Sequence, residues 1–302
     1  MESEMHKEQA SSPVAGDSAS AGNTDSILNG RDEVLEEQDG TTSKPQPQQQ
    51  RGGRGKNKRF GARNQHRHKH FVRWLEQTFP EAFQQSRVHA TMDNGNDTHH
   101  HHQQQQEQMH ILDIAGGKGE TAARLCMCLN QKVVLIDPRP ADIGHCFETL
   151  VLPKIPNKWQ QRLEAKRTVN PKFVQETLDE RFQQFTTIFD EQSLETKEDI
   201  QRAVQNASLL VGLHADGATE AIVSAALNYQ KPFVVVPCCV FPSFFPQRKL
   251  RMEDNTTVPV RTHEQFCQYL LQMDPRFQQQ VLPFEGRNIA IYWNGKTTWV
   301  RQ

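Results

Sequence analysis

The sequence predicts an α/β fold: a mostly parallel sheet with helices on both faces. Three observations carry this expectation. Short apolar runs alternate with helix-like segments along the C-terminal two thirds of the 302 residues, which is the pattern of a parallel sheet. The first such run leads straight into a glycine-rich turn, within His110-Ile-Leu-Asp-Ile-Ala-Gly-Gly-Lys-Gly-Glu120. The last two runs have no helix between them, so they predict an antiparallel hairpin that completes a Rossmann-like, seven-stranded sheet.

Composition divides the chain into an arm and a domain. Residues 1–67 form a predicted disordered arm, because the acidic first 50 residues contain almost no large apolar side chains and cannot offset the entropy of ordering. Residues 51–67 are basic and rich in arginine and glycine. Residues 68–302 form the predicted domain, which a low-complexity His/Gln insertion interrupts at 91–109.

The basic run from 51 to 73 has two interpretations. It contains nine Lys and Arg residues and no acid. Arg51-Gly-Gly-Arg54, with Phe60 as a stacking ring, is typical of segments that bind single-stranded RNA. The other interpretation is a solvated basic linker that pairs loosely with the acidic residues before it.

The cysteines and the apolar runs indicate the cellular compartment of the protein. Six cysteines lie inside apolar runs rather than at the spacing of a disulfide framework. The chain begins Met-Glu-Ser-Glu-Met, without the apolar segment of a signal peptide. Its most apolar run, 232–245, is short and broken by prolines. We expect an intracellular protein, in the cytoplasm or nucleus, with no membrane span. The histidines at 99–102 read as a tolerated surface loop rather than a metal site.

Apolar periodicity and turn residues place the elements of the domain. Helices are expected at 68–83, 121–129, 193–206, 219–229 and 262–272. Strands are expected at 111–114, 132–136, 172–179, 208–213, 231–236, 279–283 and 287–293. Parallel strands end at one edge of a sheet, so the residues that follow them should lie together.

The turn after the first strand predicts a nucleotide-binding socket. Its small residues allow close backbone approach to a ligand; they are Ala115, Gly116, Gly117 and Gly119. Asp113 precedes the turn, and Asp137, after the second strand, lies where a ribose would bind. Lys118 either contacts a cofactor carboxylate or faces solvent. Asp179, at the end of the expected third strand, either meets an adenine amino group or caps a helix.

Two cofactor classes fit such a turn. Residues 117–122 satisfy the dinucleotide pattern G-x-G-x-x-A, which predicts an NAD(P)-dependent oxidoreductase. Asp113 ahead of the small residues favours S-adenosylmethionine instead. An acid there repels a pyrophosphate and attracts a sulfonium and an ammonium group.

Three segments carry a closer resemblance: Asp113-Ile-Ala-Gly-Gly-Lys-Gly-Glu120, Val211-Gly-Leu-His-Ala-Asp-Gly-Ala-Thr-Glu220 and Val236-Pro-Cys-Cys-Val-Phe-Pro242. Together they resemble class I S-adenosylmethionine-dependent methyltransferases. The group includes acceptor-stem tRNA 2′-O-methyltransferases and methyltransferase-like proteins of unsettled substrate. The resemblance covers about residues 70–302 and implies methyl transfer, with RNA as the favoured substrate class.

Residues after the fourth and fifth strands are the candidates for chemistry. His214 is either a base or substrate-orienting residue, or a histidine that bonds a neighbouring loop. Asp216 either orients His214 or binds substrate. Pro237, Cys238 and Cys239 are expected to line the substrate mouth. No metal is expected there, because no second cysteine pair has suitable spacing. A non-catalytic scaffold that retains the fold is the remaining alternative.

Overall fold

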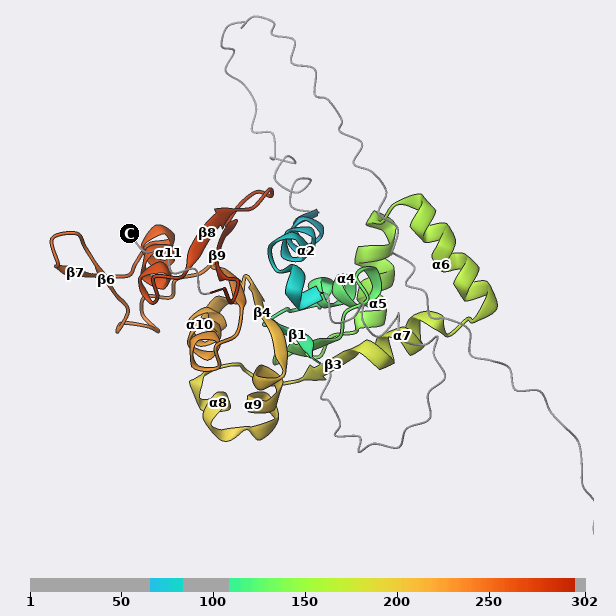
Figure 1. Ribbon diagram of the computed structural model, residues 1–302, viewed down its shortest axis with the longest axis horizontal. Helices are drawn as coiled ribbons and strands as arrows, with labels where there is room; N and C mark the ends of the chain where they lie inside the picture. Colours follow the sequence, from blue (N-terminus) through green and yellow to red (C-terminus); the bar gives the residue numbers. More distant parts are fainter. Residues whose placement is uncertain (1–65, 84–108, 297–302) are drawn as a thin grey trace, which may run out of the picture.

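The computed structural model describes residues 66–83 and 109–296 (Figure 1). The predicted disordered arm up to residue 65 and the His/Gln insertion up to 108 lie outside the described residues, as do the first fifteen positions of the basic run. Seven strands form one sheet in the order β3-β2-β1-β4-β5-β9-β8. Their bounds are β1 His110–Ile114, β2 Val133–Ile136, β3 Phe182–Phe185, β4 Ala207–Leu213, β5 Phe233–Val236, β8 Gln278–Val281 and β9 Ile289–Trp293.

The sheet confirms the predicted fold class. Strands β3, β2, β1, β4 and β5 are parallel to their neighbours. Strand β9 runs antiparallel to both β5 and β8, which makes the predicted closing hairpin. Strand order reverses between β1 and β4, and ligands of open α/β sheets bind in the crevice outside the carboxyl ends at such a switch point.

Helices cover both faces of the sheet (Figure 1). One face packs against α2 (Arg67–Thr78), α4 (Glu120–Cys128) and α7 (Phe173–Arg181), and the other against α9 (Glu198–Gln205), α10 (Thr219–Asn228) and α11 (His263–Gln272). Phe71 and Trp74 on α2 are buried in the first layer, where Trp74 meets the Tyr292 ring edge to face at 5.2 Å. None of the helices in the described part of the chain is long and apolar enough to cross a membrane.

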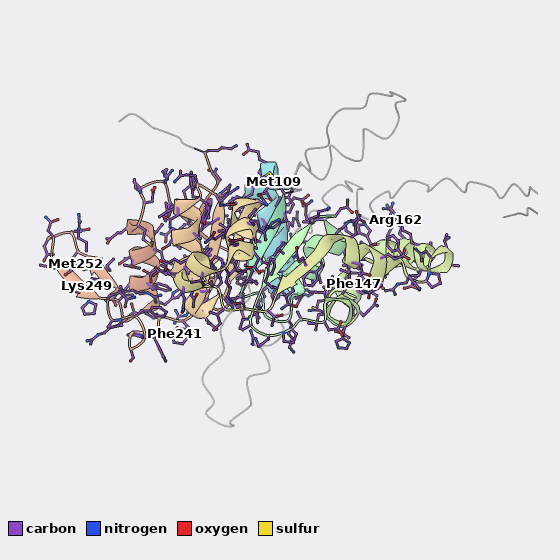
Figure 2. The ribbon with its side chains drawn as sticks, turned by 90° about the horizontal axis from the view of Figure 1, so that it is seen from below. Met109, Phe147, Arg162, Phe241, Lys249 and Met252 are labelled. Carbon is purple, nitrogen blue, oxygen red and sulfur yellow. The ribbon has the colours of Figure 1, made fainter. Side chains whose placement is uncertain are left out.

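Further elements extend the two ends of the molecule. Helix α6 (Asn157–Val169) carries Arg162 at one end, after three short helical segments, α5 (Ile143–Cys146), η2 (Phe147–Val151) and η3 (Leu152–Lys154). The hairpin of β6 (Lys249–Arg251) and β7 (Thr257–Pro259) lies at the other end, with Lys249 and Met252 (Figure 2). This hairpin was not predicted, because its strands are only three residues long.

The strand predicted at 172–179 is wrong. These residues lie in α7, and the third strand is the following β3. Phe173 and Thr177 recur at a four-residue spacing, which places both on one face of a helix, and Thr177 is buried there. The helix predicted at 193–206 is divided at Lys197, because α8 (Glu191–Thr196) ends at Thr196 and α9 begins at Glu198.

Candidate active site

Four strands deliver the predicted site residues to one edge of the sheet. The glycine turn follows β1, Asp137 follows β2, His214 follows β4 and Cys238 follows β5. The amide of Ala115 donates to the carbonyl of Ile136 at 2.7 Å, and the amide of His214 donates to that of Val236 at 3.1 Å. The strand ends are therefore fastened to one another around the switch point between β1 and β4.

Asp179 is not part of this edge. Because the third strand is β3, Asp179 does not lie at a strand end. It lies on the exposed side of α7, where its carboxylate accepts from the Gln175 amide at 2.7 Å. The residue of the third strand that reaches this edge is instead Phe185, the last of β3, whose carbonyl accepts from the Asp137 amide at 3.3 Å.

The backbone of the glycine turn adopts conformations that few residues other than glycine can adopt. Ala115, Gly117 and Gly119 have φ angles of 55°, 61° and 78°. A Cβ on Gly119 would lie 2.3 Å from Ile143 Cδ1, and one on Gly116 would lie 2.5 Å from Asp113 Oδ2. Ala115 has a side chain in the left-handed region, which costs about 1–3 kcal/mol. The turn thus keeps a tight, strained shape in which the predicted small residues are required.

Asp113 is a buried carboxyl directly beneath this turn. It has no exposed surface, and neither of its oxygens forms a hydrogen bond with the described residues. Burial raises its pKa to about 7, the charge of Asp137 raises it further, and the nearby Ala122 backbone opposes the rise. A cation held over the turn would favour the ionised form of this group.

Asp137 is paired on both oxygens. It accepts from the Gly117 amide at 2.9 Å, and from the Arg139 amide and side chain at 2.9, 3.1 and 3.3 Å. Burial alone would raise its pKa, but the bonds from Arg139 and Gly117 hold it below the ordinary value. Arg139, whose side chain is 74% exposed, covers the oxygens predicted to bind a ribose. Sequence reasoning missed this role.

A third acid stands at the start of α4. Glu120 is nearly buried and pairs with Arg124 at 2.9 Å and Lys154 at 3.5 Å. A helix N-terminus normally attracts anions. Here that position already holds a carboxylate, whose charge Arg124 and Lys154 neutralise. Asp113, beneath the turn, is the acid that suits a cationic cofactor such as S-adenosylmethionine better than a pyrophosphate. Lys118, in the turn, is exposed.

His214 sits in a left-handed backbone conformation, with φ 57°. Its Nε2 lies 2.8 Å from the carbonyl oxygen of Arg287. A carbonyl can only accept, so Nε2 carries the proton and Nδ1 holds a free lone pair. Burial lowers the pKa of His214, and the Arg287 carbonyl opposes this. The loop bond that the sequence allowed is present, and it leaves a neutral imidazole nitrogen able to take a proton.

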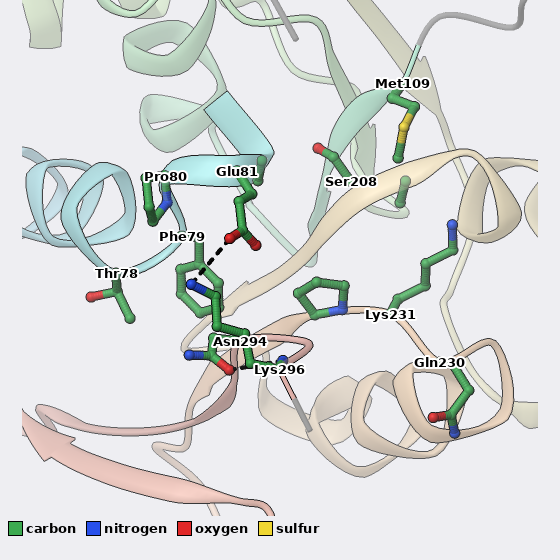
Figure 3. A pocket seen from close by; sticks show the side chains of 13 residues that line it. Thr78, Phe79, Pro80, Glu81, Met109, Ser208, Gln230, Lys231, Asn294 and Lys296 are labelled. Atoms are coloured by element: carbon green, nitrogen blue, oxygen red, sulfur yellow. Dashed lines mark hydrogen bonds and ion pairs between the residues drawn. The ribbon is translucent and has the colours of Figure 1, made fainter. Parts of the chain in front are cut away.

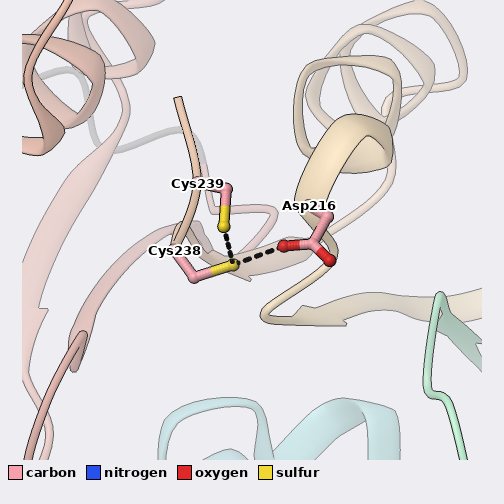
Figure 4. A group of neighbouring side chains, drawn as sticks. All are labelled: Asp216, Cys238 and Cys239. Atoms are coloured by element: carbon pink, nitrogen blue, oxygen red, sulfur yellow. Dashed lines mark hydrogen bonds between the residues drawn. The ribbon is translucent and has the colours of Figure 1, made fainter. Parts of the chain in front are cut away.

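Asp216 bonds to a cysteine rather than to His214. The Cys238 thiol donates to Asp216 Oδ1 at 2.8 Å, and the sulfurs of Cys238 and Cys239 are 3.6 Å apart (Figure 4). Burial, followed by the hydrogen bond to Asp216, raises the pKa of Cys238. A thiol held protonated is a poor nucleophile. Pro237, the third predicted mouth residue, is fixed through its carbonyl by His263 Nε2 at 3.0 Å.

A cavity of about 250 Å³ lies away from this edge (Figure 3). It is lined by the end of α2 and by residues at the amino ends of β4 and β5, including Phe79, Ser208 and Pro232. A second hollow lies against α9 and is lined by His110, at the start of β1, and by Phe185, at the end of β3. Neither is lined by a residue of the glycine turn or by Asp137, so neither is the predicted cofactor site.

Comparison with known proteins finds two solved structures with distant similarity to this chain. No family model matches the chain, and no curated protein matches its sequence. The C-terminal domain of precorrin-6Y C5,15-methyltransferase from Rhodobacter capsulatus is 10% identical, with a TM-score of 0.28, over 62% of this chain and 79% of that one. The methyltransferase domain of bacterial CtHen1-CN is 9% identical, with a TM-score of 0.35, over 76% and 97%. The functional inference rests on the site geometry instead.

Proposed function

We propose that the chain is an S-adenosylmethionine-dependent methyltransferase that acts on RNA. The observation that carries the proposal is the acid pair at the switch point. Asp113 lies beneath the glycine turn, and Asp137 is bonded to the turn through the Gly117 amide. The carboxylate beneath the turn opposes a pyrophosphate and favours a positively charged ligand, whereas Asp137 suits the ribose of either cofactor.

Each residue around the turn has a distinct proposed role in binding that cofactor. S-adenosylmethionine supplies a methyl group on a sulfonium. Asp137 provides acceptors for the ribose hydroxyls once Arg139 turns away. The turn at Ala115–Gly119 brings backbone close to the ligand. Asp113 contributes negative charge from below, which grows as its pKa falls beside a cation.

His214 is the proposed proton acceptor. Methyl transfer to a hydroxyl or nitrogen requires the acceptor to lose a proton, and a base with a pKa near or below neutral serves this step. Nδ1 of His214 is available, because Nε2 is held by Arg287. A free lone pair at the carboxyl end of β4 is thus placed beside the switch point.

Support for RNA comes from the start of α2. Arg67 is the first residue of α2, and after burial its charge also contributes to the lowered pKa of His214. Lys69 and Arg73 follow on the exposed side of the same helix. Basic residues beside the acceptor site suit a phosphate backbone.

The test is methyl transfer from labelled S-adenosylmethionine to separate RNA, protein and small-metabolite fractions. The wild type should label RNA. His214→Gln should lower the rate by about a hundredfold or more while S-adenosylhomocysteine still binds. Asp199→Asn changes an exposed acid near the start of α9; it serves as the control variant and should leave the rate unchanged. Label in protein or metabolites alone would overturn the RNA assignment, and label in no fraction would favour a non-catalytic scaffold.

A further inference from the structure

Three potential metal ligands converge beside the candidate base. Among the residues that the structure describes, Asp216, Cys238 and Cys239 form a group whose ligand atoms all lie within 4.8 Å of one another (Figure 4). Asp216 comes from the turn after β4, and the cysteines come from the segment after β5. The fold therefore assembles this donor set from two strand ends.

The spacing of the sulfurs suits one tetrahedral ion. Successive side chains of a strand point to opposite faces, yet these two sulfurs are 3.6 Å apart, because the chain has left β5. Two sulfurs at about 2.3 Å from a tetrahedral zinc ion are about 3.8 Å apart. A sulfur and a carboxylate oxygen on the same ion are separated by about 3.6 Å. The Cys238–Asp216 contact of 2.8 Å needs to open by less than about 1 Å once a metal replaces the thiol proton.

The surroundings hold the donors in place and leave one side open. Pro237, immediately before the cysteines, is fastened by the buried His263. Asp216 has a φ of 47°, which is uncommon for a residue with a side chain. Cys239 and Asp216 are exposed, while Cys238 is half-buried. Supporting hydrogen bonds around ligands and an accessible fourth position are features of zinc sites that exchange a ligand.

We propose that Asp216, Cys238 and Cys239 bind a soft divalent ion of the zinc class, with a fourth position open at the edge of the sheet. Sulfur ligands select zinc over magnesium or calcium. No metal was expected here, because the sequence has no second cysteine pair with suitable spacing. The third donor is instead an aspartate that is 22 residues away from Cys238 in the sequence. This inference does not depend on the proposed methyl transfer.

The test uses the full chain with the histidines at 99–102 replaced by alanine, so that this run cannot bind metal. Cobalt(II) is added under reducing conditions as a spectroscopic substitute for zinc. The expected result is one equivalent of ion with a thiolate-to-cobalt charge-transfer band and the intense visible bands of tetrahedral cobalt. Zinc should then displace the cobalt and remove both signals.

Variants identify the ligands. Cys239→Ser, at an exposed position, should remove much of the charge-transfer band and weaken binding by at least about tenfold, the loss that even an outer-shell change causes. Asp216→Asn should weaken binding similarly, while Cys128→Ser, a half-buried cysteine on α4, should change nothing. A six-coordinate cobalt spectrum, or binding equal in Cys239→Ser and the parent, would overturn the proposal, and either result is readable whether or not the chain methylates anything.

Discussion

Two neighbouring parallel strands end in acids whose environments are opposite. Asp113, near the end of β1, is buried without a hydrogen bond, and its pKa is raised to about 7. Asp137, directly after β2, accepts four hydrogen bonds, and its pKa is lowered. The same residue type is thus a buried carboxyl that tends to hold its proton in one position and a hydrogen-bonded carboxylate in the next.

The difference shows how this edge is prepared for a cation. Asp137 is solvated by backbone and guanidinium groups, so it can exchange those partners for ligand hydroxyls. Asp113 has no such hydrogen-bond partners to exchange. A positive charge held over the turn would lower the cost of ionising this buried carboxyl. The unfavourable burial of Asp113 is then a stability cost that ligand binding offsets.

The largest expected effect is on the pH dependence of the unfolding free energy, in which Asp113 and Asp137 should differ. A raised native pKa means that folded Asp113 holds its proton while the unfolded chain loses it, so its contribution to stability is full below pH 3.8 and is lost as pH rises towards about 7. Compared with Asp113→Asn, the wild type should lose about 4 kcal/mol of unfolding free energy between pH 4 and pH 8. Urea unfolding of both proteins without ligand measures this, and parallel pH profiles would contradict the description of Asp113.

Asp137 should matter for the ligand more than for the fold. Asp137→Asn removes the charge and half of the acceptor capacity that faces Gly117 and Arg139. One hydrogen bond to a charged group contributes about 1.5–3 kcal/mol, so affinity for S-adenosylhomocysteine should fall at least about tenfold. Calorimetry against the Asp199→Asn control checks the change. Unaltered affinity would remove Asp137 from the cofactor site.

Arg139 gives the smallest effect and tests whether Asp137 is covered in the free protein. An exposed ion pair contributes little, because solvent screens it. Arg139→Gln should free Asp137 and raise affinity for S-adenosylhomocysteine by up to about fivefold. The same titration measures it. A fall in affinity would show instead that the guanidinium holds the cofactor.

Sequence reasoning located the parts of this edge that depend on local pattern. The glycine turn, Asp137 and His214 follow buried strands, and strand ends are readable from apolar runs. The prediction for Asp179 was wrong because residues 172–179 were interpreted as a strand, although their apolar positions recur at the four-residue spacing of a helix. The partner of Asp216 could not be foreseen, since Cys238 reaches it from another strand. Neither could Arg139 as the cover of Asp137, because a side-chain rotamer decides that contact.

The central claim is that the acids around the glycine turn select S-adenosylmethionine over a dinucleotide. Calorimetric titration of the full chain with S-adenosylhomocysteine and, separately, with NAD tests it most directly. The account predicts one equivalent of S-adenosylhomocysteine bound and no measurable heat with NAD at the same concentrations. Saturable binding of NAD with none of S-adenosylhomocysteine would contradict it.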